Sequence, residues 1–125
     1  MKLSSIRKGY IGEMKVVIDL LSKGYDIYLP AIDDNGVDFL VSNGKQIKKV
    51  QCKSHDKTKS ALNTSVEINT RKCKRADVIA VPLKPRNCIC YIDSKDANRA
   101  FNIAYIEIPQ RRNRNWYKDF LEFPW

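Results

Sequence analysis

The chain has 125 residues, of which 43% are hydrophobic and 30% are charged, and its formal net charge is +9. A length of this order predicts a single domain over residues 1–125 that buries a hydrophobic core. No apolar run approaches the length of a bilayer span, and no secretory signal is visible at the N-terminus. We therefore expect a cytoplasmic protein that does not contact a membrane.

The positive charge is concentrated in the later part of the chain. Residues 1–40 contain five Lys and Arg against six Asp and Glu, whereas residues 41–125 contain eighteen against eight. A basic surface favours a polyanionic partner, usually nucleic acid, although charge also serves solubility alone. The candidates for contacts with DNA phosphates form two clusters: Arg71, Lys72, Lys74 and Arg75, and then Arg111, Arg112 and Arg114.

Residues 4–24 have the spacing of an amphipathic helix. Apolar residues recur at every third or fourth position and predict one buried stripe: Ile6, Tyr10, Met14, Val17 and Leu21. Ser4 or Ser5 can cap the start of this helix, and Gly24 fits its end. Glu13 would lie on or beside the stripe, where a carboxylate is costly unless it is paired or bound to a cation. A rim position in contact with solvent is the alternative for Glu13.

Residues 35–54 predict two short strands joined by a turn. Asp38 opens an apolar run, the Asn43-Gly44 pair accepts the positive φ of a chain reversal, and residues 47–53 form the next strand. Because side chains alternate along a strand, Gln51 and Lys53 share one face. An acid at the start of one strand and a Gln-x-Lys at the end of its neighbour can converge at one edge of the sheet.

Further strands are expected at residues 25–29, 66–68, 77–82 and 87–93. The run 77–82 is apolar, which is typical of a strand buried on both faces. Asp93 or Ser94 would cap a second helix that runs toward Asn102. The aromatic residues after 115 are candidates for a subunit interface or for a clamp over the core. The order of elements predicts a mixed α/β fold.

Four cysteines raise the question of a zinc site, and they are Cys52, Cys73, Cys88 and Cys90. They form no Cys-x-x-Cys pair, and the chain has one histidine, His55. Structural zinc sites use four Cys and His ligands at characteristic short spacings. The spacing therefore argues against zinc, and we expect reduced thiols.

Three short motifs together resemble the PD-(D/E)xK nuclease superfamily: Glu13 on a helix, Val37-Asp38 before a strand, and Gln51-Cys52-Lys53 at the end of the next strand. The resemblance implies an α/β fold with a restriction-endonuclease-like core, a mixed central β-sheet flanked by helices. The small basic layout is similar to the group I intron homing endonucleases and the archaeal Holliday junction resolvases of this superfamily. Val37 replaces the proline of the motif, and Gln51 replaces its second acid, as in an intron-type branch.

The same residues suit metal-dependent hydrolysis of a phosphodiester bond. The reaction needs an in-line water, a cation that polarises the phosphate, and positive charge near the pentavalent centre. Mg²⁺, for which Mn²⁺ is the expected substitute, prefers oxygen ligands. These would be Asp38, the Gln51 amide, the Cys52 backbone carbonyl and Glu13, the last either directly or through water. Lys53 would orient or activate the nucleophile, so the catalytic set is Glu13, Asp38, Gln51 and Lys53.

Each residue of this set also has a structural interpretation. Taken alone, Lys53 is typical of a solvated strand end and Asp38 of a cap. His55 fits a surface position better than a role as proton carrier. If the register of the strands differed, Asp33 or Asp34 would replace Asp38 as the ligand.

The leading hypothesis is a metal-dependent DNA endonuclease that cuts double-stranded DNA at a specific site, as intron homing enzymes do. A Holliday junction resolvase and a non-catalytic nucleic-acid-binding module, in which Gln51 marks a degenerate site, are the alternatives. One active site cuts one strand at a time, so cutting both strands requires at least two copies. We therefore expect a symmetric homo-oligomer, a dimer or a tetramer.

Overall fold

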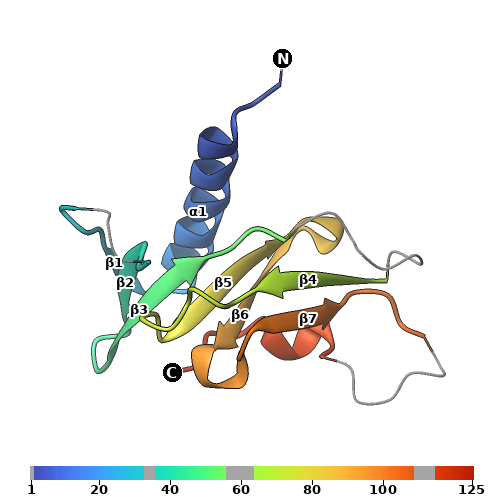
Figure 1. Ribbon diagram of the computed structural model, residues 1–125. Helices are drawn as coiled ribbons and strands as arrows, with labels where there is room; N and C mark the ends of the chain where they lie inside the picture. The colour runs from blue at the N-terminus through green and yellow to red at the C-terminus, as the bar shows by residue number, and fades with distance from the viewer. Residues whose placement is uncertain (1, 33–35, 56–63, 109–114) are drawn as a thin grey trace.

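The computed structural model describes residues 2–32, 36–55, 64–108 and 115–125. Within these ranges the elements in chain order are α1 (Ser5–Ser22), β1 (Asp26–Tyr28), β2 (Phe39–Ser42), β3 (Ile47–Cys52), β4 (Ser65–Asn69), β5 (Val78–Leu83), β6 (Cys88–Asp93) and β7 (Ala100–Ala104). Three short 3₁₀ helices are also present: η1 (Lys84–Arg86), η2 (Ser94–Asp96) and η3 (Tyr117–Phe120). Figure 1 shows their arrangement.

The main sheet has five strands in the order β1-β2-β3-β5-β6. Its pairs are antiparallel except β3 with β5, which run parallel and pair Val50 with Val78. Strands β4 and β7 form a separate antiparallel two-stranded sheet, which we call the ribbon. The mixed α/β fold predicted from the sequence is therefore confirmed. Among the described residues α1 is the one α-helix, and it covers one face of the main sheet.

Each face of the main sheet carries its own hydrophobic core. On one face, α1 packs Val16 and Leu20 against Phe39, Val50 and other sheet residues. On the other face, the ribbon packs on alternate residues of β5 and β6, so the two layers lie on opposite sides of the sheet (Figure 1). Strand β5 is thus buried on both faces, as its continuous apolar sequence predicted.

Helix α1 begins and ends as predicted but turns a different face to the sheet. The Ser4 hydroxyl accepts a hydrogen bond from the backbone N–H of Arg7 at 3.3 Å and caps the helix, and Gly24 has a positive φ of 86°. The predicted buried stripe was wrong: Val17 is half-buried, whereas Ile6, Tyr10, Met14 and Leu21 are exposed. The sheet instead meets the side of α1 that carries Val16, Leu20 and Gly12.

The predicted helix after Asp93 was also wrong. The Asp93 side chain does cap a turn, because it accepts from the N–H of Lys95 at 3.0 Å, but that turn is the short η2. The chain then enters β7, which pairs with β4 along its whole length. Phe101 and Ile103 are buried in alternation with the exposed Asn102, which is a strand pattern that the sequence analysis missed.

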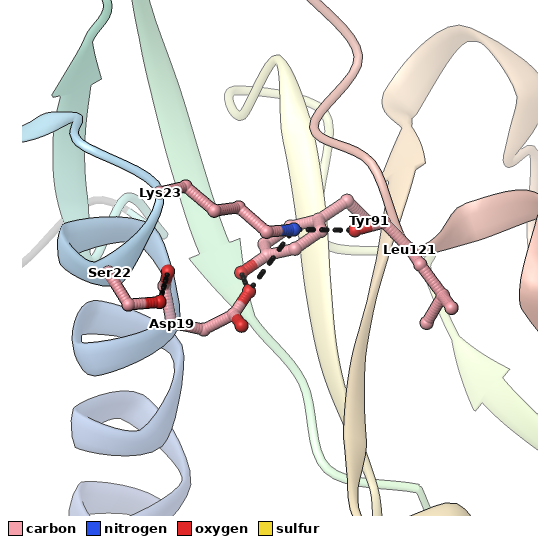
Figure 2. Close-up of polar contacts among 5 residues, drawn as sticks. All are labelled: Asp19, Ser22, Lys23, Tyr91 and Leu121. Atoms are coloured by element: carbon pink, nitrogen blue, oxygen red, sulfur yellow. Dashed lines mark hydrogen bonds and ion pairs between the residues drawn. The ribbon is translucent and has the colours of Figure 1, made fainter.

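The C-terminal tail forms a clamp over the core, one of the two roles expected for it. Lys23 Nζ donates to the Leu121 carbonyl at 2.6 Å and makes an ion pair with Asp19 at 3.4 Å (Figure 2). Phe123 is 5% exposed, and its ring lies 5.5 Å from the ring of Tyr91. The tail therefore belongs to the folded core and is held to the end of α1 by Lys23, the C-cap residue of the helix.

All four cysteines are free thiols in the structure, as expected. No helix within the described ranges has the length and apolar character needed to cross a membrane.

Candidate active site

Asp38 is held beside the end of β3 by two backbone hydrogen bonds. Its N–H donates to the Val50 carbonyl at 2.8 Å, and its Oδ2 accepts from the Cys52 N–H at 2.6 Å. These two bonds bracket Gln51, so the Asp38 carboxylate is fixed next to the Gln51 position. The convergence predicted for the start of one strand and the end of the next is thereby present.

Gln51 carries an unusual buried oxygen. Its Oε1 is buried and has no hydrogen-bond partner among the described residues. A buried acceptor without a partner costs free energy, and such atoms in native proteins call for an explanation such as an ion. The side chain lies against Gly36, where an added Cβ would be 3.7 Å from Oε1. Gly36 also has a φ of 69°, so this close approach relies on glycine.

Lys53 continues β3 by one residue. Its N–H donates to the Ala80 carbonyl at 2.9 Å, which extends the parallel pairing with β5. Val50 and Cys52 pack on the α1 side, so alternation places Gln51 on the opposite face. Lys53 lies one residue beyond β3 and lines a cleft that residues of α1 also line. The side chain of Lys53 is half-buried, which restricts it compared with a freely solvated lysine.

Two cysteines report the charges around this site. Burial raises the pKa of the Cys52 thiol, and the carboxylates of Asp38 and Glu13 raise it further. Burial also raises the pKa of Cys73, against the lowering effect of the Lys53 ammonium and with a further rise from Asp38. Both thiols therefore remain protonated near neutral pH. The charges of Glu13 and Asp38 affect the pKa of Cys52, and those of Asp38 and Lys53 affect the pKa of Cys73, so these three charged side chains lie near the end of β3.

Glu13 approaches the end of β3 from the helix layer. It is half-buried on α1 and lines a cleft of about 640 Å³ together with Cys52, Lys53 and His55. Asp38 and Gln51 are not among the residues that line this cleft. Glu13 and Asp38 nevertheless both act on the thiol of Cys52, the last residue of β3. His55 Nε2 accepts from the backbone N–H of Lys84 at 3.3 Å, which ties the segment after β3 to η1.

The donor set fits a hard divalent cation. Among the described residues there is no group of three or more His, Cys, Asp and Glu side chains that could hold a metal ion. The candidate ligands here are two carboxylates, one amide oxygen and a backbone carbonyl, and Mg²⁺ takes few protein ligands and keeps several waters. The unpartnered Oε1 of Gln51 beside the Asp38 carboxylate is the observation that favours such an ion.

The first predicted DNA-binding cluster lies close to this site. Arg71, Lys72, Lys74 and Arg75 are all exposed in the turn of residues 71–75, which we call the basic turn. The Lys72 carbonyl is 3.6 Å from the Cβ position of Gly36, next to the Gln51 amide. The second cluster, Arg111, Arg112 and Arg114, lies outside the described residues, as do Asp33 and Asp34.

Sequence reasoning missed two lysines of the cleft. Lys15 on α1 and Lys84 at the start of η1 both line the cleft. They are far apart in the sequence, and the packing of α1 on β5 brings them together. Gly12 lies at this contact, where a Cβ would be 3.6 Å from Pro82 Cγ, an ordinary van der Waals distance. The Gly9 and Gly12 pair in a helix was the available signal for a close approach.

Comparison with known families identifies the family to which the chain belongs. A family model described as PD-(D/E)XK endonuclease matches residues 3–120. The chain belongs to the PD-(D/E)XK endonuclease family. The superfamily resemblance carried by Glu13, Asp38, Gln51 and Lys53 is thus confirmed at the level of the family.

Two solved structures place this PD-(D/E)XK protein among known folds. The bacterial homing endonuclease I-Ssp6803I matches with a TM-score of 0.76 and 18% identity, over 91% of this chain and 85% of that chain. The Holliday junction resolvase Hjc of Archaeoglobus fulgidus matches with a TM-score of 0.55 and 15% identity, over 78% and 84%. At these identities the likeness shows the fold alone. No curated protein matches the chain significantly by sequence.

Proposed function

We propose that this PD-(D/E)XK protein is a Mg²⁺-dependent endonuclease that cuts double-stranded DNA at a specific site. The observation that carries the proposal is the Asp38 carboxylate, held by the backbone of β3 beside the unpartnered Oε1 of Gln51. An ion bound between these oxygens would give the buried amide oxygen a partner. It would also coordinate the carboxylate and the scissile phosphate.

The ligand roles follow from the donor atoms. Asp38 would bind the ion through its carboxylate, Gln51 through Oε1, and Cys52 through its backbone carbonyl. Glu13 would bind the ion directly or act through a water molecule. When bound, the ion would polarise the phosphate and lower the pKa of its water.

Lys53 would serve the attacking water and the charge that develops on the phosphate. Lys53 is half-buried and lies two residues after Gln51, directly beyond the end of β3, so its ammonium could donate to a water or to a phosphate oxygen near the ion. The water attacks phosphorus, the bond to the leaving oxygen breaks, and the proton lost from the water passes to solvent or to Glu13.

The specificity part of the proposal rests on Gln51. An amide in place of the second acid is a feature of the intron-type branch that the sequence resembles, so we favour a site-specific enzyme over a junction resolvase. The basic turn beside the site supplies groups for the phosphates of duplex DNA.

A mixed substrate panel tests this proposal. Supercoiled plasmid, linear duplex and a four-way junction would be incubated with the protein, with and without Mg²⁺ or Mn²⁺. We expect metal-dependent cutting of duplex at few positions. Preference for the junction would favour a resolvase. Binding without any cutting would favour a non-catalytic module, and the acids would then have structural roles.

We further propose that the active form is a homo-oligomer, a dimer or a tetramer, because one site cuts one strand. The tail is part of the core, so the surface that supports this proposal is the exposed apolar side of α1. Ile6, Tyr10, Ile18 and Leu21 are 77%, 63%, 66% and 52% exposed there. Large exposed apolar surfaces of this kind mark protein interaction sites.

A further inference from the structure

We propose that the outward face of the β4–β7 ribbon reads base edges in the major groove of duplex DNA, with Glu67 and Asn102 as the reading pair. This inference rests on the proposed function and deepens it, because it says which residues select the target sequence. The basic turn supplies phosphate contacts, which position a protein on DNA but carry no sequence information. Sequence selection requires other groups, and the ribbon offers them.

The two faces of the ribbon differ in chemistry. Val66, Ile68, Phe101 and Ile103 are at most 7% exposed and pack on the main sheet. The outward face carries three cross-strand pairs: Ser65 with Ala104, Glu67 with Asn102, and Asn69 with Ala100. Asn69, Ala100 and Asn102 are exposed and Glu67 is half-exposed, so the middle pair and the Asn69 end are open to a partner.

The side chains of the middle pair are uncommitted. Within the described part of the chain, no hydrogen bond or ion pair engages the Glu67 carboxylate or the Asn102 amide; the Asn102 backbone carbonyl accepts from Asn115 Nδ2 at 3.0 Å. An amide pairs with adenine through N6 and N7 in the major groove, and a carboxylate accepts from N4 of cytosine. The ribbon therefore presents two of the side-chain types that discriminate bases, and no other described side chain engages them.

The outward-facing residues next to Glu67 and Asn102 include small ones, which leaves both side chains accessible. Ala100 and Ser65 are the next outward residues on the two strands. Two strands lie about 4.8 Å apart, and a two-stranded ribbon is an element that the major groove, about 12 Å wide, can admit. The absence of bulky side chains beside Glu67 and Asn102 allows base pairs to approach them.

Basic groups surround the open end of the ribbon. Arg71 follows β4 and Arg99 precedes β7, and both are exposed. The segments that flank β4 and β7 are joined there by a hydrogen bond from the Thr70 N–H to the Arg99 carbonyl at 3.0 Å. Asn69 Oδ1 accepts from the Arg71 N–H at 3.1 Å and orders the start of the basic turn. Phosphates on the two sides of a groove would thus meet arginines at the end of the ribbon.

The ribbon is also connected to the active site. Three residues after Asn69, the carbonyl of Lys72 lies against Gly36, which borders the Gln51 amide. A duplex whose phosphates contact the basic turn would therefore reach the candidate metal site on one side and the ribbon on the other. This continuity links selection of the sequence to cutting of the strand.

The register predicts which positions are read. Directly opposite side chains in an antiparallel pair have Cβ atoms about 5 Å apart. The rise between base pairs is about 3.4 Å, so Glu67 and Asn102 would contact neighbouring base pairs. We expect a cytosine preference at one position and an adenine preference at the next.

The test is selection from a randomised duplex library with the intact protein, followed by measurement of binding to the selected sequence and to its single-base variants. Asn102→Ala should lower the preference for adenine by about five- to hundredfold, and Glu67→Ala should do the same for the adjacent cytosine. The salt dependence of binding should stay unchanged, because neither residue contacts a phosphate.

Gln46→Ala is the matched control, since Gln46 is an exposed amide in the β2–β3 turn. It should leave all preferences intact. Cutting of DNA with preferences that Asn102→Ala and Glu67→Ala leave unaltered would overturn this inference and spare the proposed function. Altered sedimentation of the two variants in place of altered preference would also overturn it. Absence of cutting on every substrate would overturn both.

Discussion

Asp38 is the residue on which the proposed chemistry depends most, and its geometry makes it testable without disturbing the fold. Asparagine keeps an oxygen that can accept from the Cys52 N–H, whose bond to Asp38 Oδ2 is 2.6 Å long, but it lacks the negative charge. Asp38→Asn should slow cutting in Mg²⁺ by at least about a hundredfold, since even outer groups around a metal contribute ten- to hundredfold. Gel assays on plasmid DNA would measure the rate.

DNA affinity should survive in Asp38→Asn, because the basic turn is unchanged, and it should rise slightly without Mg²⁺ when an anion near the phosphate is removed. Lys53→Ala should also stop cutting but leave metal binding intact. Asp26→Asn, an exposed acid on β1, is the control and should cut normally. Unchanged cation binding in Asp38→Asn would show that the carboxylate is structural.

Gln51 gives a prediction in which the affinity for the cation increases, whereas Asp38→Asn should decrease it. Gln51→Glu converts the unpartnered oxygen into part of a carboxylate next to Asp38. Two adjacent carboxylates repel one another without a cation and attract it more strongly, so the affinity for Mn²⁺ should rise on the order of tenfold. Calorimetric titration would measure it, with Gln46→Glu as the control. An affinity no greater than that of the wild type would mean that this side chain does not face the ion.

The elements show how far the sequence determines this fold. The strands at residues 38–41, 47–53, 77–82 and 87–93 were predicted from alternation and apolar runs, and each is present within two residues. The positions of the candidate site residues depend on these strand ends, and their catalytic roles stay a prediction. The Gly36 contact and the place of Lys72 depend on how distant segments meet, which no local pattern contains.

The two errors have physical causes of the same kind. Helix α1 has apolar residues around much of its circumference, including Ile11 and Ile18, so more than one stripe satisfies a helical period. The sheet packs against the side that carries Val16 and Leu20, and the side with Ile6, Tyr10 and Leu21 stays exposed. In β7, an Asp-Ser start and short polar residues imitate a capped helix, whereas pairing with β4 decided the outcome.

Helix α1 is joined to the sheet by Tyr91, which yields a prediction about alkaline pH. The Tyr91 hydroxyl donates to Asp19 Oδ2, and Lys23 Nζ lies 5.0 Å from the centre of its ring (Figure 2). Burial raises the pKa of Tyr91 well above its usual range, and the bond to Asp19 raises it further. The folded state therefore keeps a proton that the unfolded state loses above pH of about 10.

Because the unfolded state then binds fewer protons, the free energy of unfolding should fall as pH rises above about 10, by up to roughly 1.4 kcal/mol per pH unit from this group. Tyr91→Phe should make the fall shallower by that amount. Denaturant unfolding between pH 8 and 11 would measure it. Tyr28→Phe, at a 54% exposed position, should keep the wild-type slope. Equal slopes in Tyr91→Phe and wild type would show that Tyr91 ionises freely.

At the scale of the whole molecule, the net charge of +9 predicts that the affinity for DNA decreases as the salt concentration rises. A variant with Arg71, Lys72 and Lys74 all changed to alanine should reduce the slope of log affinity against log salt by about three units, if each side chain meets one phosphate. Fluorescence anisotropy at several salt concentrations would give both slopes. The control replaces Lys45, Lys95 and Lys118, which are exposed elsewhere. An equal reduction in the control would mean that net charge alone governs binding.

For the second cluster, Arg111, Arg112 and Arg114, contact with DNA phosphates stays a prediction.

The proposed homo-oligomer would use the exposed apolar side of α1 as its interface. If that side contacts a second copy, wild-type protein should sediment as a dimer or tetramer at tens of micromolar concentration. Tyr10→Glu should shift it to the monomer, because a buried carboxylate in an apolar interface lacks a partner. Ile47→Glu is a close control: Tyr10 and Ile47 are each 63% exposed, but Ile47 lies on β3, away from α1.

Cutting provides the second readout of assembly. Dissociated Tyr10→Glu protein keeps its Asp38, Gln51 and Lys53, so it should still nick one strand of a plasmid while losing concerted cutting of both. Ile47→Glu should linearise plasmid as wild type does. A wild-type monomer at these concentrations, with and without DNA, would contradict the interface. Loss of nicking together with linearisation in Tyr10→Glu would place the effect of α1 inside the active site, where Glu13 belongs to the same helix.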